Sequence, residues 1–174
     1  MKSLKVEFLK TDELSEETIG IINSLKNQYW KHTKKEHMKW FKENIKPNDE
    51  HLLIWGGIAL LAYLNIVHVD ITTDQKPIKA LGIGNVCVNS EKKHMGLGAI
   101  LLASSNALIK GMNSCGLLLC HDNVTDFYLK SNWNICDVKD ARIIDEPFKQ
   151  VVMAYDPHHI LPPQIDTLIM NRSF

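Results

Sequence analysis

The sequence lacks several features that mark common functional classes. It has no excess of charge of either sign, because 20 Lys and Arg residues balance 20 Asp and Glu residues, which argues against a nucleic-acid or anionic-membrane partner. None of its four cysteines forms a Cys-x-x-Cys pair, and none of its eight histidines belongs to a His-Glu-x-x-His motif, which argues against a zinc site. No apolar run is long enough to cross a bilayer, and the N-terminus lacks the apolar stretch of a signal peptide. We therefore expect a cytoplasmic protein without a metal, a nucleic-acid partner or a membrane partner.

The chain also lacks internal repeats, low-complexity segments and linker-like stretches. A chain of 174 residues can bury one sizeable core, so we expect a single domain over residues 1–174. Three prolines follow the last predicted strand, at Pro157, Pro162 and Pro163. Residues 156–174 are therefore predicted to form an irregular C-terminal tail, in which only Ile165–Met170 is a candidate for regular structure. The sequence fits a monomer and a homodimer equally well.

Hydrophobic periodicity predicts strands first and then alternating strands and helices. The two-glycine turn Gly56-Gly57 indicates a β-hairpin, and a polar loop is expected over Thr72–Lys79. This order predicts an α/β or α+β fold in three layers. The predicted strands are Leu4–Leu9, His51–Trp55, Ile58–Ile71, Ala80–Val88, Gly116–Cys120, Trp133–Val138 and Lys149–Tyr155. One predicted helix begins at Ser15, a second includes His37–Ile45, and two more cover Leu97–Met112 and Asn123–Lys130.

The most informative motif is Val86–Gly98, which reads Val-Cys-Val-Asn-Ser-Glu-Lys-Lys-His-Met-Gly-Leu-Gly. An apolar strand leads through a polar loop into Gly-x-Gly at the start of an apolar helix. This order exposes backbone N–H groups at the positive end of a helix dipole, where phosphate groups bind. The P-loop pattern is absent, and Leu101 replaces the third glycine of the Rossmann pattern. The alternative is a tight helix start that binds no ligand.

Two sequence motifs, one in the loop before the third predicted helix and one about 30 residues later, resemble the signatures of the GCN5-related N-acetyltransferase (GNAT) superfamily. Lys93–Gly98 is similar to its Arg/Gln-x-x-Gly-x-Gly/Ala motif, with Lys93 in the first position. Asp126–Trp133 is similar to its aromatic-Tyr-x-Lys-x-Gly-Phe/Trp motif. Asn132 replaces the glycine, and asparagine is the next-best residue for a left-handed cap at a helix C-terminus. The resemblance covers about residues 50–155 and implies a central mixed, mostly antiparallel sheet of about six to seven strands flanked by about four helices.

The resemblance implies that acetyl-CoA is a co-substrate and that no metal takes part. The backbone of Val86, Cys87 and Val88 would pair with pantetheine, although these residues are also typical of a buried strand. The pyrophosphate would lie over the amides of the loop. The loop residues implied in this way are Lys93, His94, Met95, Gly96, Leu97, Gly98 and Ala99.

The resemblance also makes Tyr128 the candidate general acid, which donates its phenolic proton to the departing CoA thiolate. A phenol with a pKa near 10 stays protonated at neutral pH, as a donor must. Tyr128 lies between Phe127 and Trp133 in the sequence, so a role in an aromatic core is the alternative.

No general base is evident from the sequence. Gly84 stands where the related aminoglycoside enzymes carry a glutamate, two residues before the first valine of Val-x-Val. His68, Asp70 and His121 are candidates for the base or for a water relay, and each is also typical of a hydrogen-bonded structural residue. Asn85 is a polar residue in an apolar strand and could orient a water, for which Gly84 leaves room, or bind the acceptor.

These features predict direct transfer of an acetyl group to a primary amine of a small molecule. An aminoglycoside-like amine is one candidate, because His51–Trp55 and Ile58–Ala62 resemble the corresponding hairpin of aminoglycoside 2′-N-acetyltransferases. A CoA-binding sensor or interaction module without catalysis is the rival hypothesis, since three motif positions depart from the usual residue. Transfer of a longer acyl group is a further alternative.

Overall fold

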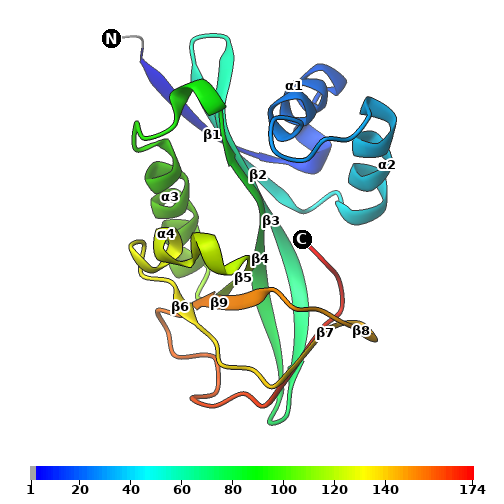
Figure 1. Cartoon of the computed structure of the whole chain (residues 1–174), viewed down its shortest axis with the longest axis vertical. Coiled ribbons are helices and arrows are strands. Elements are labelled where there is room, and N and C mark those ends of the chain that lie inside the picture. Colours follow the sequence, from blue (N-terminus) through cyan, green and yellow to red (C-terminus); the bar gives the residue numbers. More distant parts are fainter. Residues whose placement is uncertain (1–2) are drawn as a thin grey trace. The chain divides into compact units, whose positions relative to one another are not determined.

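Strands and helices succeed one another along residues 3–174, the part of the chain that the computed structural model describes (Figure 1). These residues contain four α-helices, ten strands and three short 3₁₀ turns. The chain divides into two compact units. Unit 1 comprises the residues up to Val67, Gly84–Leu101 and Phe174, and unit 2 comprises His68–Ile83 and Leu102–Ser173. Three elements contribute to both units: β3 (Ala59–Thr73), β4 (Pro77–Val88) and α3 (Leu97–Gly111).

Unit 1 contains an antiparallel arrangement of β1 (Leu4–Lys10), β2 (Glu50–Gly56) and the first part of β3. Gly57 and Ile58 form the turn between β2 and β3, one residue later than the predicted Gly56-Gly57, and Gly57 has the positive φ of 69° that favours glycine there. The register of the β2–β3 pair shifts between Ile54 and Trp55. The predicted hairpin is therefore confirmed, with an irregularity near its turn.

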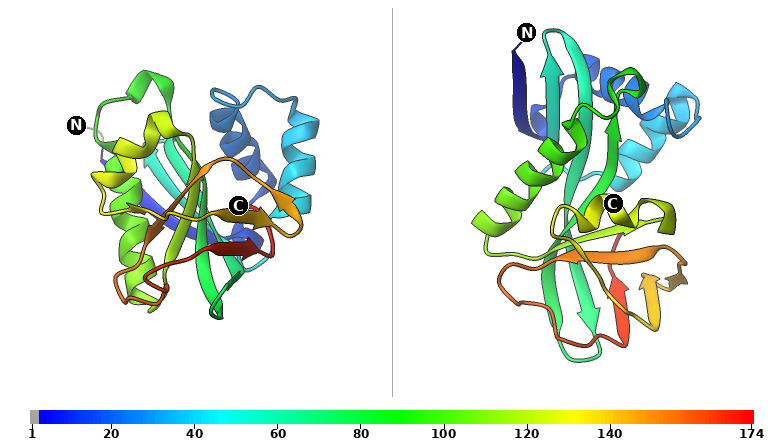
Figure 2. Two further views of the ribbon diagram at one scale, coloured as in Figure 1. Left: turned by 60° about the horizontal axis from the view of Figure 1, so that its bottom comes forward. Right: turned by 60° about the vertical axis from the view of Figure 1, so that its left-hand side comes forward.

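Two helices of unit 1, α1 (Glu16–Lys26) and α2 (Lys34–Asn44), lie side by side (Figures 1 and 2). The Ser15 hydroxyl accepts a hydrogen bond from the Thr18 N–H and caps α1. Thr33 and Glu36 form a reciprocal capping box at the start of α2. Both helices thus begin where a capping residue satisfies backbone N–H groups that have no partner within the helix.

Buried apolar side chains hold unit 1 together in two clusters. One joins the inner face of α1 to β2 and β3, and the other joins α2 to β3 and the end of the chain. The first contains Ile22, Leu25, Leu53, Leu60, Tyr63 and Cys87, and the second contains Phe41, Ile45 and Val67, with Phe174 packed against it.

Unit 2 contains a sheet in the strand order β6-β9-β5-β4-β3-β10-β7-β8. The β4–β5 and β7–β10 pairs are parallel, whereas β5–β9, β6–β9, β3–β10 and β7–β8 are antiparallel. The helix α4 (Thr125–Leu129) follows β5. The remaining strands are β5 (Gly116–Cys120), β6 (Asn134–Ile135), β7 (Asp140–Ile143), β8 (Glu146–Pro147), β9 (Val151–Tyr155) and β10 (Thr167–Met170).

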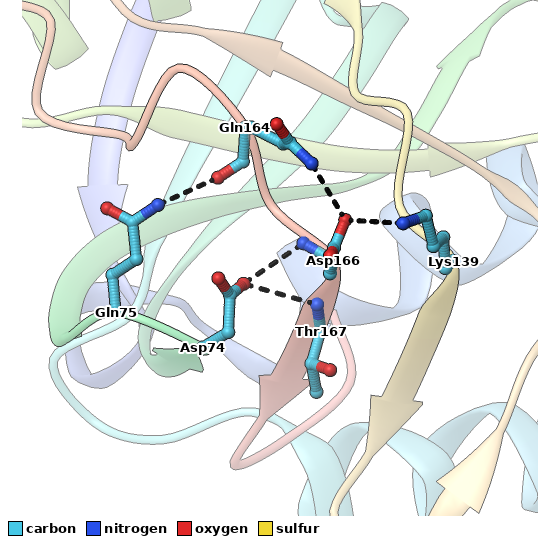
Figure 3. A network of polar contacts seen from close by, with 6 residues as sticks. All are labelled: Asp74, Gln75, Lys139, Gln164, Asp166 and Thr167. Atoms are coloured by element: carbon cyan, nitrogen blue, oxygen red, sulfur yellow. Dashed lines mark hydrogen bonds and ion pairs between the residues drawn. The ribbon is translucent and has the colours of Figure 1, made fainter.

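A network of polar contacts fixes the start of β10 (Figure 3). The Asp74 carboxylate, in the loop between β3 and β4, accepts hydrogen bonds from the N–H groups of Asp166 and Thr167 at 3.0 and 3.3 Å. The Asp166 carboxylate in turn contacts the Lys139 ammonium at 3.1 Å, and Gln75 donates to the Gln164 carbonyl at 3.2 Å. Carboxylates that accept from backbone N–H groups form strong, charge-assisted bonds, so this loop holds the final strand in register.

Segment 156–174 contains one strand, which lies within Ile165–Met170, the stretch predicted as the candidate for regular structure. Thr167–Met170 forms β10, which pairs with β3 on one side and β7 on the other. Leu168 and Met170 are buried while Thr167 and Ile169 are only partly buried, the alternation of a half-buried strand. The sequence therefore located this strand to within two residues, although not its pairing partners.

Several strands differ from the predictions in their bounds or were not predicted. The β3–β4 loop is shorter than Thr72–Lys79, because β3 continues to Thr73 and β4 begins at Pro77. The predicted strand Trp133–Val138 contains only the two-residue β6, and β7 and β8 were not predicted. The sheet therefore has more strands than the six to seven expected, because several are too short to show periodicity. None of the helices in residues 3–174 combines the length and apolar character that crossing a bilayer requires.

Candidate functional site

Strand β4 bends at Asn85, directly before the predicted pantetheine segment. Asn85 has a φ of +52°, a left-handed conformation that Asn tolerates better than other residues with a side chain. Its Nδ2 donates to the Oδ1 of Asn65 on β3 at 2.6 Å, and Asn65 is fully buried. The register of β4 with β5 extends from Leu81 to Ile83, just before the bend. A side-chain hydrogen bond thus holds the backbone in a conformation that it would otherwise adopt rarely.

The three residues after the bend end β4 in unit 1. Cys87 is buried in the cluster that includes Ile22 and Tyr63, whereas Val86 and Val88 are partly buried. Burial raises the pKa of the Cys87 thiol to about 12, against a smaller lowering by Lys26. The Cys87 thiol is therefore protonated at neutral pH and acts as a small apolar side chain, as predicted from the sequence.

The polar loop after β4 is tied to its surroundings by main-chain contacts. The Asn89 N–H donates to the Leu61 carbonyl at 2.7 Å, and the Ser90 N–H donates to Gln28 Oε1 at 2.8 Å. The Tyr29 hydroxyl donates to the Val88 carbonyl at 2.5 Å. Gln28 and Tyr29 follow the C-terminus of α1, so this turn fixes the position where the loop begins.

The Lys93 side chain lies over the aromatic face of Tyr29, with 4.9 Å between Nζ and the ring centroid. This is a cation–π contact, which orients an ammonium without neutralising its charge. The contacts of Gln28 and Tyr29 with the loop were not predicted, because the helical spacing of Tyr29 after α1 is equally typical of a packing residue. Only the long-range pairing with Val88 and Lys93 identifies these residues.

The glycine motif forms an exposed turn before α3. His94 and Gly96 have positive φ values of 62° and 78°. The Gly96 carbonyl accepts the first helical bond, from the Ile100 N–H at 3.0 Å, while the buried Leu97 side chain fixes the helix start. The Met95 side chain is 66% exposed. Positive φ values at alternate residues also occur in the concave nests of backbone N–H groups that bind anions in proteins.

Tyr128 lies on α4 in unit 2, whereas the glycine motif precedes α3 in unit 1. Its side chain is buried and lies edge-on to Phe127, with 5.0 Å between the ring centroids. Burial, with a smaller effect of Cys120, raises the pKa of Tyr128 above its usual value near 10. The phenol therefore keeps its proton at neutral pH, as a donor to a thiolate must.

The end of α4 is closed by the motif that carries Asn132. Asn132 has a φ of +63°, and the Trp133 N–H reaches back to the Tyr128 carbonyl at 3.3 Å, as in a Schellman motif. The buried Trp133 donates from Nε1 to Asn106 Oδ1 at 2.9 Å. The predicted use of asparagine as a left-handed cap is thus confirmed by the backbone geometry.

The candidate bases lie in unit 2. His68 and Asp70 are exposed residues of β3, and His121 is exposed at the end of β5. Asp70 makes reciprocal bonds with Asn171: its N–H donates to Asn171 Oδ1 at 3.0 Å, and its carboxylate accepts from Asn171 Nδ2 at 3.1 Å. Asp70 thus holds the C-terminal segment. No three His, Cys, Asp or Glu side chains in residues 3–174 gather closely enough to hold a metal ion.

In unit 1 a chain of hydrogen bonds joins the partly buried Thr11 to the buried His51 and Tyr63. The Thr11 hydroxyl donates to the Asp49 carbonyl at 3.1 Å, so its oxygen accepts from His51 Nε2 at 2.9 Å. The other ring nitrogen, Nδ1, then accepts from the Tyr63 hydroxyl at 2.7 Å. Burial lowers the pKa of His51 to about 4 and raises that of Tyr63, so both groups are neutral at pH 7.

Comparison with known proteins identifies the fold. No family model and no curated protein sequence matches the chain. Among solved structures, Escherichia coli ElaA is 17% identical with a TM-score of 0.64, covering 87% of this chain and 99% of that one. An aminoglycoside 6′-N-acetyltransferase complexed with coenzyme A is 12% identical with a TM-score of 0.64, covering 90% and 98%. A GCN5-related N-acetyltransferase from Anabaena variabilis is 14% identical with a TM-score of 0.62, covering 76% and 32%. The chain has the GNAT fold.

The GNAT fold confirms the predicted fold class of a mixed, mostly antiparallel sheet with four helices in the described residues. One neighbour is a 6′-N-acetyltransferase, so the sequence resemblance to the 2′-N-acetyltransferases stays a prediction. At these identities the likeness establishes the fold, and function has to be argued from the residues of this chain.

Proposed function

We propose that the protein transfers an acetyl group from acetyl-CoA directly to a primary amine of a small molecule. The observation that carries the proposal is the exposed turn between the bent end of β4 and α3, with left-handed residues at His94 and Gly96. A neighbour with the same fold is a complex with coenzyme A. The acceptor class includes aminoglycoside-like amines, for which the β2–β3 hairpin resemblance is the support.

The pyrophosphate of CoA is proposed to bind the backbone N–H groups of the turn and the first turn of α3. The positive end of the helix dipole and the nest of N–H groups both favour an anion there. The ammonium of Lys93, held over Tyr29, adds a full positive charge close to the same turn. The proposed contacts are Lys93, His94, Met95, Gly96, Leu97, Gly98 and Ala99.

Pantetheine is proposed to pair with the backbone of Val86, Cys87 and Val88, after the bend at Asn85. Because the Tyr29 hydroxyl already holds the Val88 carbonyl and Leu61 holds Asn89, the end of this segment is ordered before a ligand arrives. Such preorganisation lowers the entropy cost of binding. The contact of Val88 with pantetheine then relies mainly on its N–H.

In the reaction, the amine nitrogen attacks the thioester carbon, the new C–N bond forms and the C–S bond breaks. Tyr128 is proposed to donate a hydrogen bond to the departing thiolate. Since its pKa is raised above 10, complete proton transfer to a thiolate with a pKa near 8.5 is unfavourable, and the thiolate gains its proton from solvent on release. The amine loses its proton to water, for which His68, Asp70 and His121 are the proposed relay groups and Asn85 the orienting side chain.

The test is thiol release from acetyl-CoA with kanamycin, spermidine and phenethylamine as acceptors, alongside a CoA thermal-shift titration of the same chain. Transfer predicts amine-dependent thiol release and a CoA-dependent rise in Tm. A rise in Tm without thiol release from acetyl-CoA or propionyl-CoA would instead favour the rival sensor function, which the missing carboxylate at Gly84 motivates. No rise in Tm at millimolar CoA would refute both.

A further inference from the structure

The space beside Gly84 is occupied by the end of the chain. A Cβ on Gly84 would lie 2.3 Å from the carbonyl carbon of Phe174, 2.8 Å from its oxygen and 3.2 Å from Oδ1 of Asn65. Distances below 3.0 Å to main-chain atoms leave no room for any side chain. The main chain of Phe174 thus partly fills the space beside Asn85 in which we expected a water molecule. Position 84 has to be glycine for the main chain of Phe174 to approach so closely.

The side chain of Phe174 explains why its main chain stays there. Its ring packs against the cluster of Phe41, Ile45 and Val67, which belongs to the same unit as Gly84. Phe174 is only partly buried, unlike those three residues. An apolar anchor therefore holds a polar main-chain group against the backbone of β4.

Two oxygen atoms converge next to the bend of β4. One is the main-chain oxygen of Phe174, and the other is Oδ1 of Asn65, which already accepts from Asn85 Nδ2 at 2.6 Å. Oxygen atoms are the partners that an amine N–H requires. The residues that these oxygens approach, Gly84 and Asn85, directly precede the segment Val86–Val88 that is proposed to hold the thioester.

We propose that the main-chain oxygen of Phe174 binds the amine of the acceptor and orients it toward the thioester. This inference rests on the proposed acetyl transfer. The oxygen accepts an amine N–H and directs the nitrogen lone pair to the thioester carbon. The C–N bond then forms, the amine proton passes to water, and the C–S bond breaks to give the CoA thiolate.

The first variants test the place of the main chain. Gly84→Ala adds a methyl group that displaces Phe174, and we expect kcat/KM for kanamycin, spermidine or phenethylamine, whichever the wild-type chain uses, to fall at least about tenfold. The Kd for CoA should change less than about twofold, because the anion site is elsewhere in the sequence. Gly20→Ala is the matched control, since a Cβ there meets nothing within 4 Å, and it should leave both quantities unchanged.

The second variants test the anchor. Phe174→Ala keeps the main chain but removes the ring that holds it, and should lower kcat/KM for the amine about tenfold, chiefly through the KM for the amine. Phe174→Leu retains an apolar anchor and should stay within about threefold of the wild type. Deleting Phe174 while introducing Gly84→Glu supplies a carboxylate in the vacated space and should recover activity relative to the deletion alone.

The outcomes separate this inference from the proposed function. Wild-type activity in both Gly84→Ala and Phe174→Ala, with unchanged KM for the amine, would overturn the role of Phe174 and leave acetyl transfer intact. A wild-type chain that binds CoA and acetylates none of the amines would overturn acetyl transfer to these acceptors and the inference with it. Equal loss of CoA affinity and amine activity in Gly84→Ala would show a general distortion of β4 and would also refute the specific role.

Discussion

Replacing Asn85 tests whether the bend of β4 depends on this side chain. Two contributions hold it: Asn tolerates the φ of +52°, and its Nδ2 satisfies the buried Oδ1 of Asn65. An alanine in the left-handed region costs about 1–2 kcal/mol. Leaving a buried acceptor without its partner costs about 1–3 kcal/mol. Asn85→Ala should therefore lower the free energy of unfolding by about 3 kcal/mol, and Asn85→Gly, which loses only the hydrogen bond, by about 2 kcal/mol.

The assay is urea denaturation of the wild type and both variants at pH 7, followed by CoA titration of each. Because glycine keeps the left-handed backbone, Asn85→Gly should retain CoA affinity within about threefold, whereas Asn85→Ala should lose more. Equal stability of the two variants would show that backbone strain contributes nothing at Asn85. Wild-type stability in both would refute the whole account of the bend.

Three further predictions concern other residues. Tyr128→Phe removes the proposed hydrogen-bond donor to the departing thiolate and should lower kcat about 10²-fold with the Kd for CoA unchanged, measured by thiol release. An unchanged kcat would assign Tyr128 to packing alone. The pKa of His51 is about 4 in the folded protein and about 6.5 in the unfolded chain, so between these pH values the unfolded state binds more protons. The free energy of unfolding should therefore fall by about 3 kcal/mol as the pH drops from 7 to below 4. His51→Gln should remove that part of the pH dependence. Asn132→Ala should cost about 1 kcal/mol in urea unfolding while Asn132→Gly costs none, and equal costs would exclude a conformational role for the positive φ.

The sequence predicted the elements whose signals are local. The helix start at Ser15, the glycine turn before β3, and the apolar period of α3 each specify a backbone conformation within a few residues. The cap at Thr33, which precedes the predicted second helix, was not predicted. The substitution of asparagine for glycine at Asn132 was interpreted correctly for the same reason, since a left-handed cap restricts the residue type at one position.

The features that could not be predicted from the sequence arise from contacts between residues that are far apart in the chain. The approach of Phe174 to Gly84 and the hydrogen bond of Tyr29 to Val88 join segments that no periodicity links. The bend at Asn85 was likewise unpredicted, although its polar character within an apolar strand was noticed. Short strands such as β7 and β8 were missed because two to four residues are too few for a pattern, and they form by pairing with neighbours.

The most direct test of the proposed CoA site is the stabilisation of the fold by CoA in the wild type, Gly96→Glu and Gly96→Ala. A Cβ at Gly96 meets nothing within 4 Å, so both variants carry the same backbone strain and only the glutamate adds a negative charge. At about 100 times its Kd, CoA should stabilise the wild type by about 2.7 kcal/mol. We expect Gly96→Ala to retain a CoA-dependent rise in Tm and Gly96→Glu to lose it. A wild-type chain that shows no rise at millimolar CoA, or a Gly96→Glu variant that binds as tightly as Gly96→Ala, would contradict the assignment of this turn as the pyrophosphate site.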